Sequence, residues 1–317
     1  MIVRKIGVAI GTLFVVVTAN FFLFRVVQTD PVAAVYRGRN LSEAKKAELE
    51  ERFNLNGSKL DQYVGYLEQL SHGNLGYTLN SQPVSSEIAE KLPTTLKLVG
   101  TTTILTAVIG IWLGIRAGWR PRSKFDRITT GITMFFYSTS DAFFGLALLY
   151  LFASKNPWFP TGGLIDPNST ATGLNRILEQ FHHLVLPGTV LVIGYLGQYS
   201  LVQRAAMLET SGEDYLTLAR AKGLRDSLVR RRHAVPNALL PSITLIALNV
   251  GYTIGGAIIV ETTFSIPGIG SELVRAAKGP DYALLQGIFL LISAAVIAAT
   301  LIADLLYPRF DPRVRTP

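Results

Sequence analysis

The residues with the clearest chemical character form a polar, basic run from Asp214 to Leu224, which lies between two long apolar segments. Glu213 and Asp214 stand where a helix start favours negative charge, and Gly223 can adopt the left-handed turn that ends many helices. The pattern therefore predicts a short helix that ends at Gly223. This segment is too polar to cross a membrane and too helix-prone to be a linker, so we expect it to contact a partner.

A second group of polar residues lies within apolar segments. Asp141 and Asp304 are acids in such segments, where a charge is expensive to bury and is a functional candidate by default. Asp304 has Arg309 within reach near the segment's end, which favours structural pairing. For Asp141 two interpretations stay open, a place on a solute pathway or a buried hydrogen bond between helices.

The sequence does not contain the residues that several kinds of chemistry require. The chain has no cysteine, and its four histidines have no metal-ligand spacing, so we predict no metal site. It contains neither a Gly-x-x-x-x-Gly-Lys-Ser/Thr phosphate loop nor a Gly-x-Ser-x-Gly nucleophile motif. We therefore expect that the chain does not hydrolyse ATP itself and is not an enzyme.

The elements that must position these residues are predicted to be membrane helices. With 49% hydrophobic and 16% charged residues, the chain is too apolar for an ordinary soluble domain of 317 residues. Its apolar residues gather in six runs, each near the ~20 residues that cross a bilayer as a helix. The predicted spans are residues 6–24, 98–115, 128–154, 184–203, 234–260 and 283–306.

The Lys and Arg residues indicate the orientation of these spans. With the N-terminus inside, 17 of the 30 basic residues and 6 of the 22 acids lie on the inner side. This bias predicts cytoplasmic N- and C-termini and explains the net charge of +8 without nucleic acid. The predicted regions are a first membrane helix (1–27), an outer helical region (28–97) and a core (98–317) with a cytoplasmic loop at 207–236.

Two finer features concern packing. In the outer region, helices are predicted near residues 43–52 and 60–70. Glycines recur at four-residue spacing as Gly110, Gly114 and Gly118, and again as Gly251 and Gly255. Such small faces let membrane helices approach closely, so we favour helix packing over substrate contact for them.

Several motifs together resemble one family. Asp214-Tyr215 followed by Ala219-Arg220-Ala221-Lys222-Gly223-Leu224 resembles the cytoplasmic loop of ABC-importer permeases, in particular the B-type permeases of peptide importers. The runs 158–163, 255–270 and 304–315 resemble further motifs of this family, so the resemblance extends over essentially the whole chain. The chain departs from the family at Asn74, where an acid is usual, and at Asp141, where proline is common.

The resemblance implies a fold, a function and a set of partners. The fold is an all-α, six-span permease of the type I ABC importers in the bacterial inner membrane. The chain would pair with a second homologous permease and work with two ATPases, which bind ATP and Mg, and with an extracytoplasmic binding protein. The residues implied to couple to the ATPase are Asp214, Tyr215, Ala219, Arg220, Ala221, Lys222, Gly223, Leu224 and Arg225.

Two more groups of residues are predicted to form parts of the site. Asp141, Asn249 and Glu261 are candidates for the translocation path, where Asp141 could meet the ammonium group of a peptide. An outer-mouth loop would hold Phe264, Pro267, Gly268 and Gly270, although ordinary turn chemistry explains its Pro-Gly pair equally well.

The alternative from another class is a self-sufficient secondary transporter or channel. It would need inverted repeats, broken helices or ionisable residues along a pathway, and only Asp141 and Asp304 point that way. The energy source separates the two functions. The sequence leaves the cargo open among dipeptides, oligopeptides, glutathione-like molecules and nickel chelates.

Overall fold

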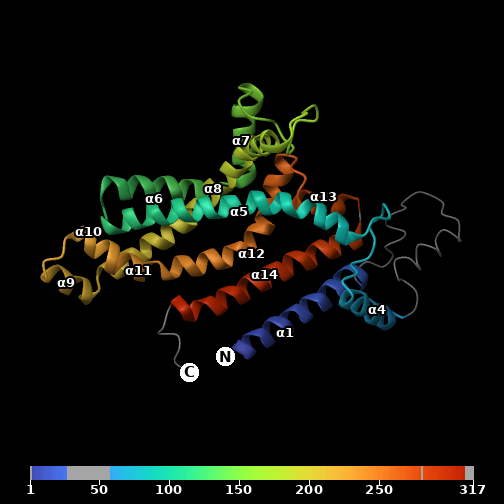
Figure 1. The fold of residues 1–317 in the computed structure, drawn as a ribbon, viewed down its shortest axis with the longest axis horizontal. Helices are drawn as coiled ribbons and strands as arrows, with labels where there is room; N and C mark the ends of the chain where they lie inside the picture. The colour runs from blue at the N-terminus through green and yellow to red at the C-terminus, as the bar shows by residue number, and fades with distance from the viewer. Residues whose placement is uncertain (1, 27–57, 280, 311–317) are drawn as a thin grey trace. The chain divides into compact units, whose positions relative to one another are not determined.

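The computed structural model describes residues 2–26, 58–279 and 281–310, and these ranges are mainly helical (Figure 1). The chain divides into two compact units. The first unit holds residues 1–95 and 267–298, and the second holds residues 96–266 and 299–317. Within the described ranges, the single β contact is an isolated bridge between Tyr77 and Pro83.

The first unit is built from helices that lie far apart in the sequence. They are α1 (Ile2–Phe21) with the π-helical turn η1 (Phe22–Val26), α4 (Lys59–Ser71), the start of α5 (Val84–Trp119), α13 (Ile269–Lys278) and much of α14 (Tyr282–Phe310). Apolar side chains from η1, α5, α13 and α14 form its core. Its buried members are Phe24, Val84, Ile88, Ile269, Ala276, Leu284, Leu285 and Ile288.

The predicted helix at 60–70 is confirmed as α4. Its start is set by Ser58, whose hydroxyl accepts from the Asp61 backbone N–H while the Asp61 carboxylate accepts from the Ser58 N–H. Tyr63 and Tyr66 pack their rings against Phe21 of α1. The helix predicted at 43–52 lies outside the described residues.

The second unit contains the longer helices and the polar loop. Its elements are the rest of α5, α6 (Lys124–Tyr137), α7 (Asp141–Leu149), η2 (Tyr150–Lys155), α8 (Gly173–Ser211), α9 (Asp214–Ala221), α10 (Asp226–Val229), η3 (Arg230–Ala234), α11 (Val235–Ala238) and α12 (Leu240–Thr263). One apolar core joins α5, α7, η2, α8 and α12. It includes Leu98, Ala153, Leu186, Val190, Leu191, Val260 and Phe264.

The first glycine series packs α5 directly against α8, which confirms the helix-packing prediction. An ideal Cβ placed on each of these glycines would lie 2.6 Å from a Cβ atom of α8. The pairs are Gly110 with Tyr199, Gly114 with Gln203 and Gly118 with Met207. Both series advance by four residues, so two helix faces meet along their length. The surroundings of Gly251 and Gly255 lie outside the described residues.

Within the described ranges, four helices are long and apolar enough to cross a membrane. These segments are Val3–Phe24, Val84–Trp119, Gly173–Ser211 and Tyr282–Ile302. A bent pair, residues 124–137 and 141–155, adds a fifth if it is one span. Helix α12 has 24 residues and occupies the position of the remaining predicted span. Helices therefore stand at all six predicted positions, and the number of spans stays a prediction.

The third predicted span, residues 128–154, is not one straight helix, and this expectation was wrong. α6 ends at Tyr137, α7 begins at Asp141, and the two segments are bent by 95°. Ser138 and Thr139 donate their hydroxyls to carbonyls four residues back, at 2.8 Å each. Such bonds compete with the helix ladder and favour a bend.

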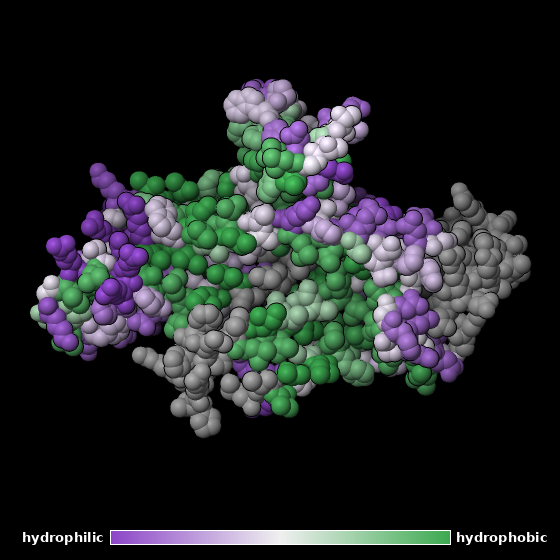
Figure 2. All heavy atoms as spheres, in the orientation of Figure 1, coloured by the Kyte–Doolittle hydropathy of each residue, from purple (hydrophilic) through white to green (hydrophobic). Residues whose placement is uncertain are grey.

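Large apolar side chains are exposed along the second unit. Figure 2 shows hydrophobic side chains over α6 and hydrophilic ones around α9 and α10. Five side chains of α5 and α6 that are more than half exposed are Ile104, Val108, Ile128, Ile132 and Phe135. A soluble monomer rarely shows such a surface, whereas lipid or another membrane helix covers it at no cost in hydration.

Candidate functional site

The polar run of the sequence forms a helix at the end of α8. α8 stops at Ser211, Glu213 takes the N-cap position, and α9 covers Asp214–Ala221. Asp214 lies in the first turn of α9 and Arg220 in its last turn, so both charges oppose the partial charges of the helix ends. The predicted short helix is confirmed.

One face of α9 is buried against the rest of the loop. Leu216 is fully buried and Ala219 nearly so, and both belong to an apolar cluster that we name the loop-base cluster. Its buried members are Ala206, Met207, Leu216, Ala219, Val229, Ala234 and Ala238. Because these residues come from α8, α9, α10, η3 and α11, burial of this cluster holds α9 against both chain segments that lead to and from it.

Polar contacts secure the same helix at both ends. Asn237 Nδ2 donates to the Tyr215 hydroxyl at 3.0 Å. Trp119 Nε1 donates to the Asp226 carboxylate at 2.9 Å, and Arg220 lies over the Trp119 ring with its Nε 3.7 Å from Asp226. Arg220 and the Tyr215 hydroxyl are thus engaged within the chain.

The opposite face of α9 is solvent exposed. Asp214, Thr217, Leu218 and Ala221 form this outer face, and Leu218 exposes 57% of its surface. Leu218 was not among the predicted site residues. Helical periodicity could have found it, because Leu218 lies opposite the buried pair of Leu216 and Ala219.

Gly223 ends the helix as predicted. Its φ is +79°, and its N–H donates to the Arg220 carbonyl at 2.9 Å. Leu224 then packs back on the loop-base cluster, while Lys222 and Arg225 are exposed. Of the predicted coupling residues, Ala219 and Leu224 therefore face inward, and Asp214, Ala221, Lys222 and Arg225 face solvent.

Polar side chains of α8 join this loop to the neighbouring helices. Gln203 is fully buried, donates to the Ala238 carbonyl at 3.0 Å and accepts from the Ser242 hydroxyl at 2.6 Å. Arg204 makes two hydrogen bonds to Asp126 of α6, one of them from Nη2 at 2.9 Å. These contacts fix α8 to α6, α11 and α12 just before the loop begins.

The three candidate residues for the translocation path lie in different surroundings. Asp141 is the first residue of α7 and lies so close to Gly194 that a Cβ there would be 2.5 Å from its Oδ1. Asn249 is buried and donates to Gln198 Oε1 at 3.0 Å, and Glu261 is fully buried in α12. Asn249 and Glu261 are twelve residues apart on α12, which is about 18 Å along a helix, so these two side chains do not meet. The sequence did not reveal that Asp141 begins a helix, where its charge is favoured.

In the second unit, the structure brings two of the sequence motifs together near Phe264. Phe264 is buried, and its carbonyl accepts from the Gly163 N–H at 3.0 Å. Gly162 approaches so closely that a Cβ there would lie 2.6 Å from the Phe264 carbonyl oxygen. His183 Nδ1 lies 3.2 Å from the carbonyl oxygens of both glycines.

In the first unit, the remaining residues of the outer-mouth loop lead into α13. Gly268 takes the N-cap position of α13, and Gly270 is buried in its first turn. Arg275 pairs with Glu272 and with Glu87, and the hydrogen bond to Glu272 raises the pKa of the Arg275 guanidinium. Helix α13 was not predicted, because the Pro-Gly pair suggested only a turn.

No group of three or more histidine or carboxylate side chains in the described ranges could hold a metal ion. In the same ranges, α9 is a surface helix whose inner face packs on the loop-base cluster and whose outer face is partly apolar.

Comparisons with known proteins agree with one another. The family described as binding-protein-dependent transport system inner membrane component matches residues 110–316. A probable peptide ABC transporter permease of Sinorhizobium fredii is 33% identical over 99% of this chain and 98% of its own length. The oligopeptide transport system permease AppB of Bacillus subtilis is 32% identical, and the di/tripeptide transport system permease DppB of Pseudomonas aeruginosa is 34% identical, each with the same coverage.

Proposed function

The chain belongs to the family of binding-protein-dependent transport system inner membrane components, and on this premise we propose that it is the permease subunit of a peptide ABC importer. The observation that carries this proposal is the full-length similarity to permeases of peptide transport systems. The mechanism is alternating access, in which two packings of the spans open toward opposite sides of the membrane.

The proposed partners supply what the chain lacks. Two ATPases bind ATP and Mg, an extracytoplasmic binding protein delivers peptide, and a second homologous permease completes the pathway. The family description supports dependence on a binding protein, and the missing phosphate loop supports a separate ATPase. In this arrangement both termini and the 207–236 loop are cytoplasmic, as the distribution of basic residues predicts.

Coupling is proposed to run through α9. Its outer face, with Leu218 at the centre, would dock on the ATPase, and Lys222 and Arg225 would add charge at the edge of the contact. The loop-base cluster and Gln203 would then transmit the movement of α9 to α8 and α12. A rigid attachment suits this role, because a loose loop would absorb the displacement.

The translocation path is proposed to involve Asp141, Asn249 and Glu261. The half-buried carboxylate of Asp141 could attract the ammonium group of a peptide. The buried positions of Asn249 and Glu261 would require the spans to separate before either residue could meet cargo. Phe264, Pro267, Gly268 and Gly270 would shape the outer mouth.

The docking of α9 is tested by purification of the tagged chain from its native membranes in mild detergent. Leu218→Glu places a charge on the outer face without touching the loop-base cluster. The matched control is Leu178→Glu on α8, because Leu178 is exposed to 58% against 57% for Leu218. We expect ATPase to co-purify with the wild type and the control, and most of it to be lost from Leu218→Glu.

Two results would contradict parts of this proposal. Retention of the ATPase by Leu218→Glu would show that the outer face of α9 is not the docking site. Absence of any ATPase from the wild type, under conditions that retain other membrane partners, would reject the importer and favour a self-sufficient transporter.

A further inference from the structure

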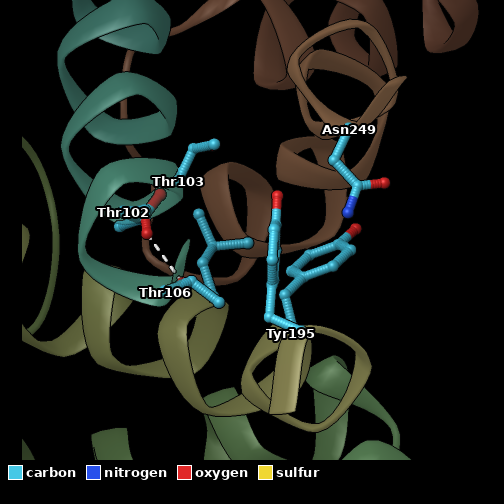
Figure 3. A pocket seen from close by; sticks show the side chains of 7 residues that line it. Thr102, Thr103, Thr106, Tyr195 and Asn249 are labelled. Carbon is cyan, nitrogen blue, oxygen red and sulfur yellow. Dashed lines mark hydrogen bonds between the residues drawn. The ribbon is translucent and has the colours of Figure 1, made fainter. Parts of the chain in front are cut away.

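A small cavity lies within the second unit, between α5, α8 and α12 (Figure 3). Most of its lining consists of uncharged polar side chains. They are Thr102, Thr103 and Thr106 from α5, Tyr195 and Tyr199 from α8, and Asn249 from α12. The cavity volume of about 10 Å³ is close to what one water molecule needs.

Two buried hydroxyls at this cavity have unused hydrogen-bonding capacity. Among the residues that the structure describes, Thr103 Oγ1 has no hydrogen-bond partner, and the Tyr199 hydroxyl has none besides the nearby Asn249 carboxamide. Tyr199 is only 1% exposed, so bulk solvent does not supply one. The Asn249 carboxamide lies near the Tyr199 hydroxyl, but its Nδ2 donates to Gln198 Oε1 at 3.0 Å.

The other threonines of the lining could support a small polar ligand. Thr102 Oγ1 donates to the Leu98 carbonyl and Thr106 Oγ1 to the Thr102 carbonyl, each at 2.7 Å. Their hydroxyl protons are used, but their oxygens keep lone pairs that can accept. The cavity therefore combines acceptors with two hydroxyls that can either donate or accept.

We propose that one water molecule binds in this cavity and bridges Thr103 Oγ1 and the Tyr199 hydroxyl. Buried waters in proteins typically make about three hydrogen bonds to groups that otherwise lack partners. In a membrane protein the need is greater, because lipid offers no hydrogen bonds. The size of the cavity excludes a peptide in this conformation, so the ligand is water rather than cargo.

The water joins α5 to α8 beside Asn249 of α12. Direct packing fixes the same two helices further along, where Gly114 and Gly118 meet Gln203 and Met207. When the two helices move relative to each other, a bridging water can exchange one hydrogen-bond partner for another, so that no polar group loses its hydrogen bond. The close packing at the glycines does not allow such an exchange. The inference goes beyond the proposed function and does not depend on the identity of the cargo.

X-ray radiolytic footprinting of the full chain, purified with its native partners in mild detergent, tests this water. Radiolysis of a bound water produces hydroxyl radicals at the site, and these oxidise side chains that bulk radicals cannot reach. We expect Tyr199 to be oxidised at least about tenfold faster than Phe264, which is equally buried at 1% exposure and packs in an apolar core.

Thr103→Val removes one partner of the water and keeps the shape of the side chain, so oxidation of Tyr199 should fall several-fold. Thr101→Val is the matched control, because the Thr101 hydroxyl is already bonded to backbone carbonyls and lines no part of the cavity. Oxidation of Tyr199 no faster than that of Phe264 in the wild type would overturn the proposal, and this measurement needs no variant. An unchanged rate in Thr103→Val would overturn the bridge.

Discussion

Two glycines in the cytoplasmic loop show how backbone angles decide the role of a single residue. Gly223 ends α9 with φ of +79°, whereas Gly212 ends α8 with φ of −84°. No atom lies within 4 Å of an ideal Cβ at Gly223, so conformation and not space restricts this position. A residue with a Cβ is strained in the left-handed conformation of Gly223 but adopts the backbone angles of Gly212 without strain.

Gly223→Ala should therefore weaken the end of α9. The left-handed conformation costs a residue with a Cβ about 1–2 kcal/mol. We expect peptide-stimulated ATP hydrolysis by the purified complex to fall by about tenfold if this cost is fully expressed, and Gly212→Ala to leave it unchanged. Asn is tolerated in this region, so Gly223→Asn should lose less than Gly223→Ala. Equal activity of all three variants would show that the turn does not matter for coupling.

At the scale of elements, α5 approaches α8 closely along the series Gly110, Gly114 and Gly118. The glycines of α5 let its backbone approach the side chains of α8 to a distance that no larger residue would permit. Within the same stretch of α8, Gln203 and Arg204 hold this helix to three other helices. The base of the cytoplasmic loop is thus fixed from several sides.

Gly114→Ala should disrupt this packing. The added Cβ would lie 2.6 Å from both the Gln203 Cβ and the Ser200 carbonyl oxygen, so the helices would have to separate. Overpacking of this kind typically costs about 1–3 kcal/mol. We expect a lower thermal midpoint of the detergent-purified complex and a lower yield. Gly100→Ala on the same helix is the control, because no atom lies within 4 Å of its ideal Cβ. Equal loss in both variants would show that the contact of Gly114 with α8 is not the cause.

At the scale of the whole molecule, the proposed function requires energy from outside the chain. The sequence has no phosphate loop, and the part of the chain that the structure describes holds no cluster that could bind a metal ion. The exposed outer face of α9 is the proposed contact with the source of that energy. An importer of this kind depends on ATP and not on an ion gradient.

Uptake by the reconstituted complex should show this dependence directly. In vesicles with ATP enclosed on the ATPase side and the binding protein outside, we expect uptake of labelled dialanine or tetra-alanine that continues when ionophores collapse the ion gradients. Replacement of ATP by a non-hydrolysable analogue should abolish it. Uptake that follows the ion gradient without ATP would instead identify a secondary transporter.

The sequence by itself determined the helical membrane class, the approximate positions of the long apolar helices and the helix that ends at Gly223. These features depend on local composition and on one backbone angle, which neighbouring residues encode directly. The interpretation of Gly110, Gly114 and Gly118 as a packing face also held, because helical periodicity places them on one side of α5.

Only the tertiary structure decided which side of each element is available. It turned Ala219 and Leu224 inward, left Leu218 exposed, and engaged Arg220 with Trp119 and Asp226. The tertiary structure also decided the bend between α6 and α7, which makes Asp141 the first residue of a helix. Such outcomes depend on partners that are distant in the sequence, and a local pattern of residues carries no information about which distant side chains will cover it.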